Sequence, residues 1–140
     1  MIVAALAALD GKEIAVVARS PVIESAALGP SRRRYANAAT LLDTTLAPES
    51  LLEHLQSIED DFGRNRRGQR WGARVLDLDI VLWSGGPWAS ESLVIPHPEF
   101  RRRSFVLDPA ATIAADWRDP VTGLTVRHLR ARLTRGKPLP

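Results

Sequence analysis

Val75–Trp83 constrains the fold of this chain more than any other segment. Its sequence, VLDLDIVLW, alternates hydrophobic residues with two aspartates. Because successive side chains of a β-strand point to opposite faces, a strand here has one apolar face, made of Leu76, Leu78, Ile80 and Leu82. The other face carries Val75, Asp77, Asp79 and Val81. The pattern predicts a strand that packs its leucine face on a helix layer and presents two carboxylates side by side.

The other segments predict a mixture of helices and strands. Apolar residues recur at helical spacing from Leu51 to Phe62, after Pro48 and before Gly63, which predicts a helix. Strand composition occurs in 13–19 and 22–25, with Pro21 between them, and in 35–45, which we expect to pair with them. Shorter elements are expected as a helix at 1–9, a strand at 93–95, helical turns at 99–107 and 109–115, and a helix at 126–133. Residues 84–92 and 116–123 are expected as connectors. With 140 residues, the order predicts one α+β domain with helices packed on a sheet.

Composition excludes several classes of protein. The chain has no cysteine, so disulfides, thiolate metal sites and a cysteine nucleophile are excluded. The longest apolar stretches have about nine residues, whereas a membrane helix needs roughly 20. The first residues, MIVAALAALD, lack the basic start and cleavage site of a signal peptide. We therefore expect a cytoplasmic protein without a membrane segment.

Arginines gather in three loops, at Arg32–Arg34, Arg64–Arg74 and Arg101–Arg103. Of 19 Lys and Arg residues, only Lys12 and Lys137 are lysines. The planar guanidinium binds phosphate through two parallel hydrogen bonds. The central loop, GRNRRGQRWGAR, lacks the Lys-Ser/Thr of a Walker loop, so its phosphate contacts would come from side chains. The arginines predict an anionic ligand, either a nucleotide or nucleic acid; a flexible basic loop without a ligand is the alternative.

Asp77 and Asp79 form a candidate metal site. Two strand rises place their Cα atoms about 6.6 Å apart on one face, from which their oxygens can converge on hard cations. The alternative is a solvated strand face paired with arginines, because short motifs often match by chance. Aspartate is disfavoured in strands, and the apolar neighbours Val75, Val81 and Trp83 are unusual for a solvated face. These features favour the metal site.

Weaker candidates lie outside these motifs, and each has a structural alternative. His97, between two prolines, could contact a phosphate or cap a turn. Tyr35 and Asn37 share a strand face and could bind a flat ring, or could be a core ring and a hydrogen-bonded amide. Gln56 and Glu59 share a helix face, where a salt bridge to the arginine loop is the default.

Together these motifs resemble a known family. The run RWGARVLDLDI, from Arg70 to Ile80, resembles the signature of the 6-hydroxymethyl-7,8-dihydropterin pyrophosphokinases of folate biosynthesis. Further similarities keep the family's order and extend over about 22–115. They are Leu28-Gly29-Pro30, Tyr35-x-Asn37, Leu46-Ala47-Pro48-Glu49, Ile58-Glu59 with Gly63-Arg64, Pro96-His97-Pro98 and Arg103-x-Phe105.

The resemblance implies a ferredoxin-like sandwich, with a mainly antiparallel sheet, that binds ATP and a pterin side by side. It implies that Asp77 and Asp79 hold two Mg²⁺ ions and that Arg64 and Arg74 attend the transferring group, these four being the catalytic residues. The residues implied on the nucleotide side are Gln56, Glu59, Arg66, Trp71, Ile80, His97 and Arg103. Those implied in the pterin pocket are Leu28, Tyr35, Asn37 and Phe105, with the two aromatic rings flanking the pterin.

The reaction implied is attack of the pterin hydroxymethyl oxygen on the β-phosphorus of ATP, which transfers diphosphate and releases AMP. It depends on alignment and charge neutralisation. We expect a single domain over 1–140, a monomer that binds no nucleic acid. The sequence departs from the family in lacking its first strand and Gly-Ser-Asn loop, so the domain is expected to be N-terminally shortened. A catalytically impaired nucleotide-binding remnant and a basic RNA-binding α+β module are the alternatives.

Overall fold

The computed structural model describes residues 2–26, 34–64 and 76–135. Its helices are α1 (Ile2–Leu9), α2 (Pro48–Arg64), α3 (Ser104–Ala114) and α4 (Val126–Thr134), with the short 3₁₀ helix η2 (Phe100–Arg102). Its strands are β1 (Ile14–Arg19), β2 (Ile23–Ala26), β3 (Arg34–Asn37), β4 (Thr40–Thr44), β5 (Trp88–Ala89) and β6 (Val94–Ile95). The expected α+β class is confirmed. No described helix is long and apolar enough to cross a membrane.

The first four strands form an interrupted antiparallel hairpin. β1 pairs with β4, from Ile14 opposite Thr44 to Arg19 opposite Thr40, and β2 pairs with β3. Ser20 connects the two halves: its backbone N–H donates to the Ala39 carbonyl (2.8 Å), and its hydroxyl oxygen accepts from the Ala39 N–H (2.8 Å). The expected strand pairing and the interruption at Pro21 are both confirmed.

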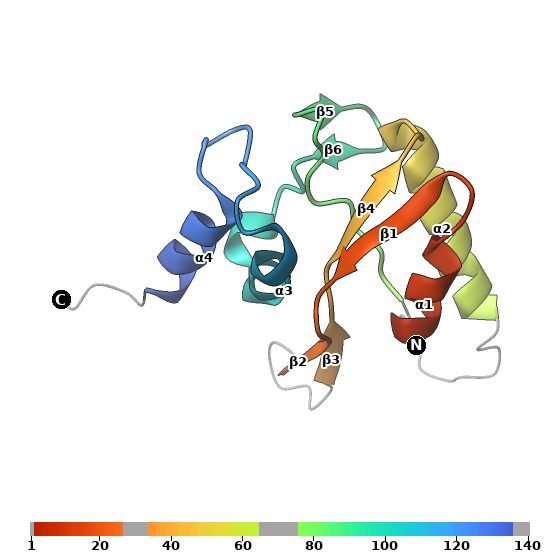
Figure 1. Ribbon diagram of the computed structural model, residues 1–140, viewed down its shortest axis with the longest axis horizontal. Coiled ribbons are helices and arrows are strands. Elements are labelled where there is room, and N and C mark those ends of the chain that lie inside the picture. The colour runs from red at the N-terminus through yellow and green to blue at the C-terminus, as the bar shows by residue number, and fades with distance from the viewer. Residues whose placement is uncertain (1, 27–33, 65–75, 136–140) are drawn as a thin grey trace.

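Helices lie on both sides of the β1–β4 pair, as Figure 1 shows, with α1 and α2 on one side and α3 and α4 on the other. The helix predicted from the Leu51–Phe62 periodicity is α2, which begins at Pro48 and continues one residue past Gly63. Its buried residues Leu55 and Ile58 join Leu6 and Leu9 of α1 in a first core cluster. This cluster fills the space between the two helices and the sheet.

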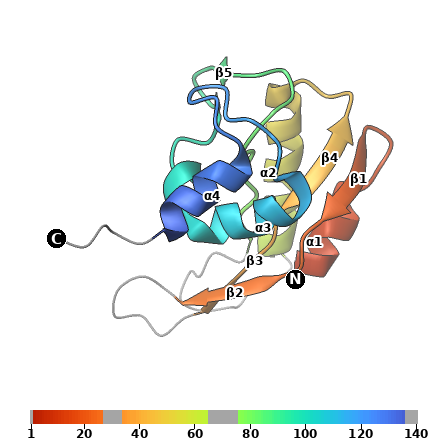
Figure 2. The same ribbon diagram turned by 60° about the vertical axis from the view of Figure 1, so that its left-hand side comes forward.

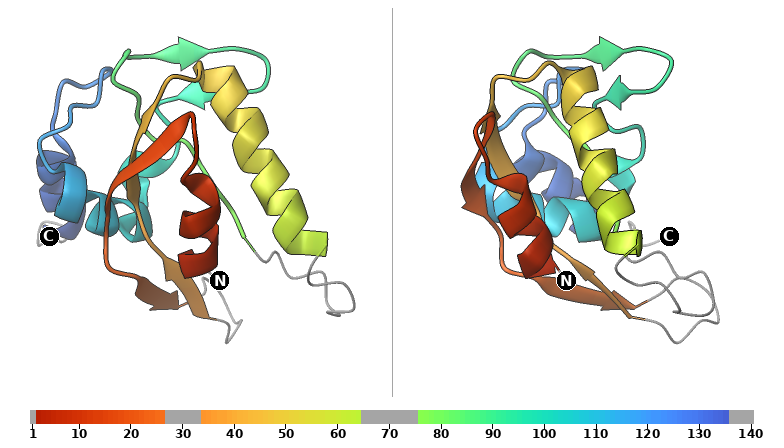
Figure 3. Two further views of the ribbon diagram at one scale, coloured as in Figure 1. Left: turned by 45° about the vertical axis from the view of Figure 1, so that its right-hand side comes forward. Right: turned by 90° about the vertical axis from the view of Figure 1, so that its right-hand side faces the viewer.

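The predicted strand at Val75–Trp83 is not a strand in its described part. Residues 76–83 carry no strand assignment, and β1 and β4 pair with each other instead. In Figure 3 the segment runs as an irregular trace between β4 and α2. The described strands accordingly form three two-stranded sheets rather than one continuous sheet. The alternating pattern predicted the two faces correctly for residues 76–80. Val81 and Leu82, expected on opposite faces, both pack against the second core cluster. A pattern also cannot supply a hydrogen-bonding neighbour.

A second core cluster lies on the other side of the molecule. It contains the buried residues Phe100, Leu107, Val126 and Leu129 of η2, α3 and α4, and Figure 2 shows α3 and α4 side by side. Partly buried Val81 and Leu82 pack against it. The end of the 76–83 segment therefore leaves the first cluster and joins the second.

Residues 84–95, expected as a loop before a short strand, form the small β5–β6 hairpin. Glu49, in the first turn of α2, holds this hairpin. Its carboxylate accepts hydrogen bonds from the Ser90 and Ser92 hydroxyls and from Trp88 Nε1 (3.4 Å). The pKa of the Glu49 carboxyl is lowered mainly by the hydrogen bond from Ser90 and next by the hydrogen bond from Ser92.

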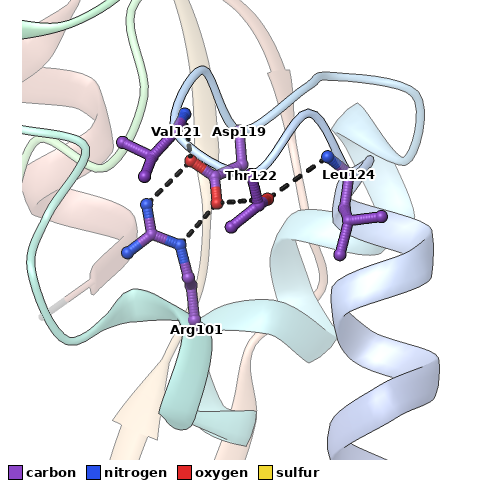
Figure 4. Close-up of polar contacts among 5 residues, drawn as sticks. All are labelled: Arg101, Asp119, Val121, Thr122 and Leu124. Atoms are coloured by element: carbon purple, nitrogen blue, oxygen red, sulfur yellow. Dashed lines mark hydrogen bonds and ion pairs between the residues drawn. The ribbon is translucent and has the colours of Figure 1, made fainter.

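The connector at 116–123 contains a fully buried carboxylate, Asp119, which is 0% exposed. Arg101 of η2 donates to it through Nε and Nη2, and Thr122 and the Val121 N–H donate as well (Figure 4). Arg101 is the main cause that lowers the pKa of Asp119 far below its ordinary value, and Asp119 in turn raises the pKa of Arg101. Four hydrogen bonds thus converge on one carboxylate, and the two from Arg101 fix the connector against η2.

Candidate active site

Asp77 and Asp79 are both exposed, on a segment whose alternate side chains are in the core. Leu76, Leu78 and Ile80 pack against the first core cluster. Burial of these apolar groups, each worth about 1.5–3 kcal/mol when complete, fixes which way the segment faces. The expected arrangement of one leucine face and one carboxylate face is therefore present without a strand ladder in the described residues.

Two hydrogen bonds attach the backbone of this segment to the rest of the site. Glu59 of α2 accepts from the Leu78 N–H at 2.6 Å. Two residues beyond Asp79, the Val81 carbonyl accepts from the His97 N–H at 3.0 Å. The Glu59 side chain is thus bonded to the backbone between the two aspartates, and the His97 backbone is bonded two residues after Asp79.

His97 lies in the turn after β6 and is half-buried. The Glu99 N–H donates to its Nδ1 at 3.1 Å. Because Nδ1 accepts this bond, the ring proton of neutral His97 is on Nε2, which can donate to a phosphate oxygen. The prediction of a rigidly held histidine is consistent with this turn.

Arg103 and Phe105 lie at the start of α3 and contact each other. The Arg103 guanidinium carbon is 5.6 Å from the centre of the Phe105 ring, a distance typical of a cation–π contact. The sequence assigned these two residues to different ligands. Their contact places an arginine expected on the nucleotide side directly beside an aromatic ring expected on the pterin side.

Tyr35 and Asn37 lie on one face of β3, as expected, because they are two residues apart on a strand. Tyr35 is 51% exposed, so the alternative of a core ring is excluded. Asn37 Nδ2 donates to the Tyr35 carbonyl at 3.5 Å. Helix α3, which carries Phe105, contacts β2 and β3.

The structure describes some of the remaining predicted site residues and does not describe others. Gln56 is exposed on α2, and Arg64 is the last residue of that helix. Ile80, expected on the nucleotide side, packs against the first core cluster. Four predicted site residues lie outside the described residues, namely Leu28, Arg66, Trp71 and Arg74.

Candidate metal ligands are limited to hard oxygen donors. Within the described ranges, no three His, Cys, Asp or Glu side chains gather to hold a metal. Asp77 and Asp79 supply two exposed carboxylates, and Mg²⁺ is commonly bound by one or two carboxylates together with waters and substrate phosphates. The donor set therefore fits Mg²⁺ bound jointly with a phosphate ligand better than a metal held by protein alone.

Two features of the site were not predicted from the sequence. The Glu59–Leu78 bond joins residues 19 positions apart, and the Val81–His97 bond joins two segments through backbone atoms alone. Backbone contacts of this kind leave no residue signature. The position of Glu59 just before the arginine loop was the one available signal, and the salt bridge that it suggested involves arginine side chains outside the described ones.

Comparisons with known proteins place this chain in a class, that of proteins similar to pyrophosphokinases. A family model described as 7,8-dihydro-6-hydroxymethylpterin-pyrophosphokinase matches residues 1–115. The chain therefore belongs to the 7,8-dihydro-6-hydroxymethylpterin-pyrophosphokinase family. The resemblance seen in the sequence is confirmed, and the family favours neither of the two alternatives, the remnant or the RNA-binding module.

Three relatives bear the name 2-amino-4-hydroxy-6-hydroxymethyldihydropteridine pyrophosphokinase. The protein of Methylorubrum extorquens is 43% identical over 91% of this chain and 78% of its own length. That of Pseudomonas aeruginosa is 45% identical over 81% of this chain and 73% of its own. That of Synechocystis is 43% identical over 75% of this chain, a match that spans only 53% of the Synechocystis protein.

Proposed function

We propose that this chain transfers diphosphate from ATP to the hydroxymethyl group of 6-hydroxymethyl-7,8-dihydropterin and releases AMP, as a step of folate biosynthesis. The observation that carries the proposal is the pair of exposed carboxylates, Asp77 and Asp79, on a segment fixed by its own apolar side chains. Family membership supports the reaction, and the carboxylate pair supports its dependence on a metal–nucleotide complex.

Asp77 and Asp79 would hold two Mg²⁺ ions together with the phosphates of ATP. Bound Mg²⁺ would neutralise charge on the phosphates and orient them. The protein's contribution is to keep the two carboxylates on one side of the segment, which the packing of Leu78 between them enforces. Side chains already oriented lose less entropy when the ligand binds.

The arginines provide the remaining positive charge. Arg64 and Arg74 are proposed to stabilise the charge that develops on the transferring group and on the leaving AMP. The residues proposed on the nucleotide side are Gln56, Arg66, Trp71, Ile80, His97 and Arg103. The proposed pterin pocket consists of Leu28, Tyr35, Asn37 and Phe105.

In the proposed step, the pterin hydroxymethyl oxygen forms a bond to the β-phosphorus of ATP. The bond between that phosphorus and the oxygen bridging to the α-phosphorus breaks. AMP leaves with the electron pair, and the hydroxyl proton is lost to solvent. The rate depends on in-line alignment and on charge stabilisation, so no covalent nucleophile is required.

We also propose the finer structural assignments that the sequence suggested. These are a ferredoxin-like arrangement, one functional unit over residues 1–140, and a monomer that acts in the cytoplasm and binds no nucleic acid. The hairpin with helices on both sides supports the first. The exposed carboxylates argue against nucleic acid, because without a bound metal they would repel its phosphates.

The test is AMP release from ATP on addition of the pterin, with and without Mg²⁺. Asp79→Asn should lower the rate at least about 100-fold, equivalent to about 2.7 kcal/mol of transition-state stabilisation, with unchanged circular dichroism. The control Asp60→Asn removes an exposed carboxylate of α2 and should leave the rate within twofold. If the wild type releases no AMP, the alternative of a catalytically impaired nucleotide-binding remnant is favoured. RNA binding that weakens with salt and is unaffected by Asp77→Ala would identify the RNA-binding module.

A further inference from the structure

Glu59 contacts the peptide backbone at the point where the two aspartates meet. Its side chain is half-buried on α2, and its Oε2 accepts from the N–H of Leu78, the residue between Asp77 and Asp79, at 2.6 Å. This distance is at the short end of N–H···O bonds, as expected for a charged acceptor. A carboxylate of one element therefore binds the central amide of the proposed metal-binding segment.

The same residue, Leu78, is attached on two sides. Its side chain packs against the first core cluster, which contains Leu55 and Ile58 of α2, while its amide is bound by Glu59 of the same helix. Residues 76–83 do not form a strand, so among the described residues no neighbouring strand holds this backbone. Helix α2 thus substitutes for a strand partner at the position that separates the two carboxylates.

We propose that Glu59 is a positioning residue that orients Asp77 and Asp79 toward the metal–phosphate complex, and not a nucleotide contact. The metal part of this inference rests on the proposed function. An additional carboxylate beside a triphosphate would repel it, whereas a carboxylate that binds the Leu78 amide fixes the direction of the neighbouring aspartates. Groups that orient metal ligands from behind commonly contribute 10–100-fold to metal affinity or activity.

The contact is tested directly by the hydrogen exchange rate of the Leu78 amide in the protein without nucleotide or metal. Glu59→Ala should accelerate this exchange at least about 10-fold. Glu59→Gln should retain most of the protection, because its carbonyl oxygen still accepts a hydrogen bond. Glu53→Ala, an exposed carboxylate on the same helix, should change nothing. Unchanged Leu78 exchange in Glu59→Ala would overturn the proposal.

The role is tested by separating metal use from nucleotide binding. In Glu59→Ala the Mg²⁺ concentration for half-maximal rate should rise about 10–100-fold, with partial rescue in Glu59→Gln. The Kd for ATP measured in EDTA should stay within twofold. A nucleotide contact gives the reverse result, weaker ATP binding in EDTA with an unchanged Mg²⁺ requirement, and that result would overturn the proposal.

These measurements also distinguish failure of this proposal from failure of the proposed function. If the wild type shows no turnover, the proposed function fails, but Mn²⁺ binding followed by electron paramagnetic resonance still reports the carboxylate pair. Weaker Mn²⁺ binding in Glu59→Ala then supports the positioning role, and equal binding overturns it. If Glu59→Ala does not fold, Glu59→Gln and Glu53→Gln are compared in the same exchange and metal-binding measurements. The expected differences between these two variants have the same direction but are smaller.

Discussion

Asp119 provides the sharpest prediction about stability, because its side chain is fully buried and charged. Asp119→Asn keeps the size of the side chain but removes the charge that Arg101 binds through Nε and Nη2. It also directs an amide NH₂ group toward hydrogen-bond donors. The variant therefore converts a satisfied pair into an uncompensated guanidinium beside a mismatched amide.

The expected loss is about 3 kcal/mol of unfolding free energy. Breaking a buried ion pair by removing one partner costs roughly 3–5 kcal/mol. The Arg101 side chain is 27% exposed, so water recovers part of the lost interaction, which places the value at the lower end. For a domain of this size the loss corresponds to about 10 °C in Tm, a large part of a typical total stability of roughly 5–15 kcal/mol.

Urea unfolding followed by circular dichroism measures this loss. The matched control is Asp116→Asn, because Asp116 pairs with Arg127 at 2.8 Å while both side chains are 65% or more exposed. An exposed pair of this kind contributes no more than about 1 kcal/mol. If the two variants lose the same free energy within about 0.5 kcal/mol, the reasoning about the buried network is refuted.

Three further predictions concern acid stability, the second core and the pterin pocket. Because the pKa of Asp119 is below its ordinary value of 3.8 in the folded chain, its stabilisation is complete above that value and is lost as the pH falls through the folded pKa. The difference in unfolding free energy between wild type and Asp119→Asn should therefore shrink in urea titrations below about pH 4, and a constant difference would contradict the assigned charge. Leu107→Ala, at a position 0% exposed, should lose about 3 kcal/mol in the same titrations, whereas Leu133→Ala, at a position 39% exposed, should lose less than about 1 kcal/mol. Tyr35→Ala should raise the Kd for the pterin about 10-fold in calorimetry with little effect on stability, since the ring is 51% exposed; unchanged affinity would remove Tyr35 from the pocket.

Local patterns predicted the parts of the fold that depend on local interactions. The helical spacing of Leu55 and Ile58 predicted α2, whose apolar stripe lies in the first core cluster. Alternation and Pro21 predicted an interrupted hairpin, and the pairing of β1 with β4 and β2 with β3 confirms it. The positions of these helices and strands depend on residues close together in the chain, so a single sequence contains the necessary information. The pairing of the strands was inferred from their order in the chain.

Features that depend on distant partners were not predicted. Residues 76–80 have the two faces of a strand, but 76–83 form no ladder with any described strand. The β5–β6 hairpin is held by Glu49, some 40 positions away. The Asp119 network joins η2 to a segment expected only as a connector. In each case the partner is chosen by tertiary packing, which periodicity does not encode.

The candidate site, like the fold, was predicted only in part. The exposure of Asp77 and Asp79 followed from alternation, and the strand spacing placed Tyr35 and Asn37 on one face. Alternation also placed Ile80 on the apolar face, and Ile80 packs against the first core cluster, whereas no sequence signal predicted the bond from the Leu78 amide to Glu59. Residue identity alone indicated the chemistry of this site better than it indicated which groups are in contact.

The central claim is transfer of a diphosphate unit, and product analysis with ATP labelled on its γ-phosphate tests it most directly. With Mg²⁺ and 6-hydroxymethyl-7,8-dihydropterin, chromatography should show AMP and a labelled pterin carrying two phosphates in equal amounts. ADP formed together with a singly phosphorylated pterin, or an unmodified pterin after prolonged incubation with the folded chain, would contradict the account.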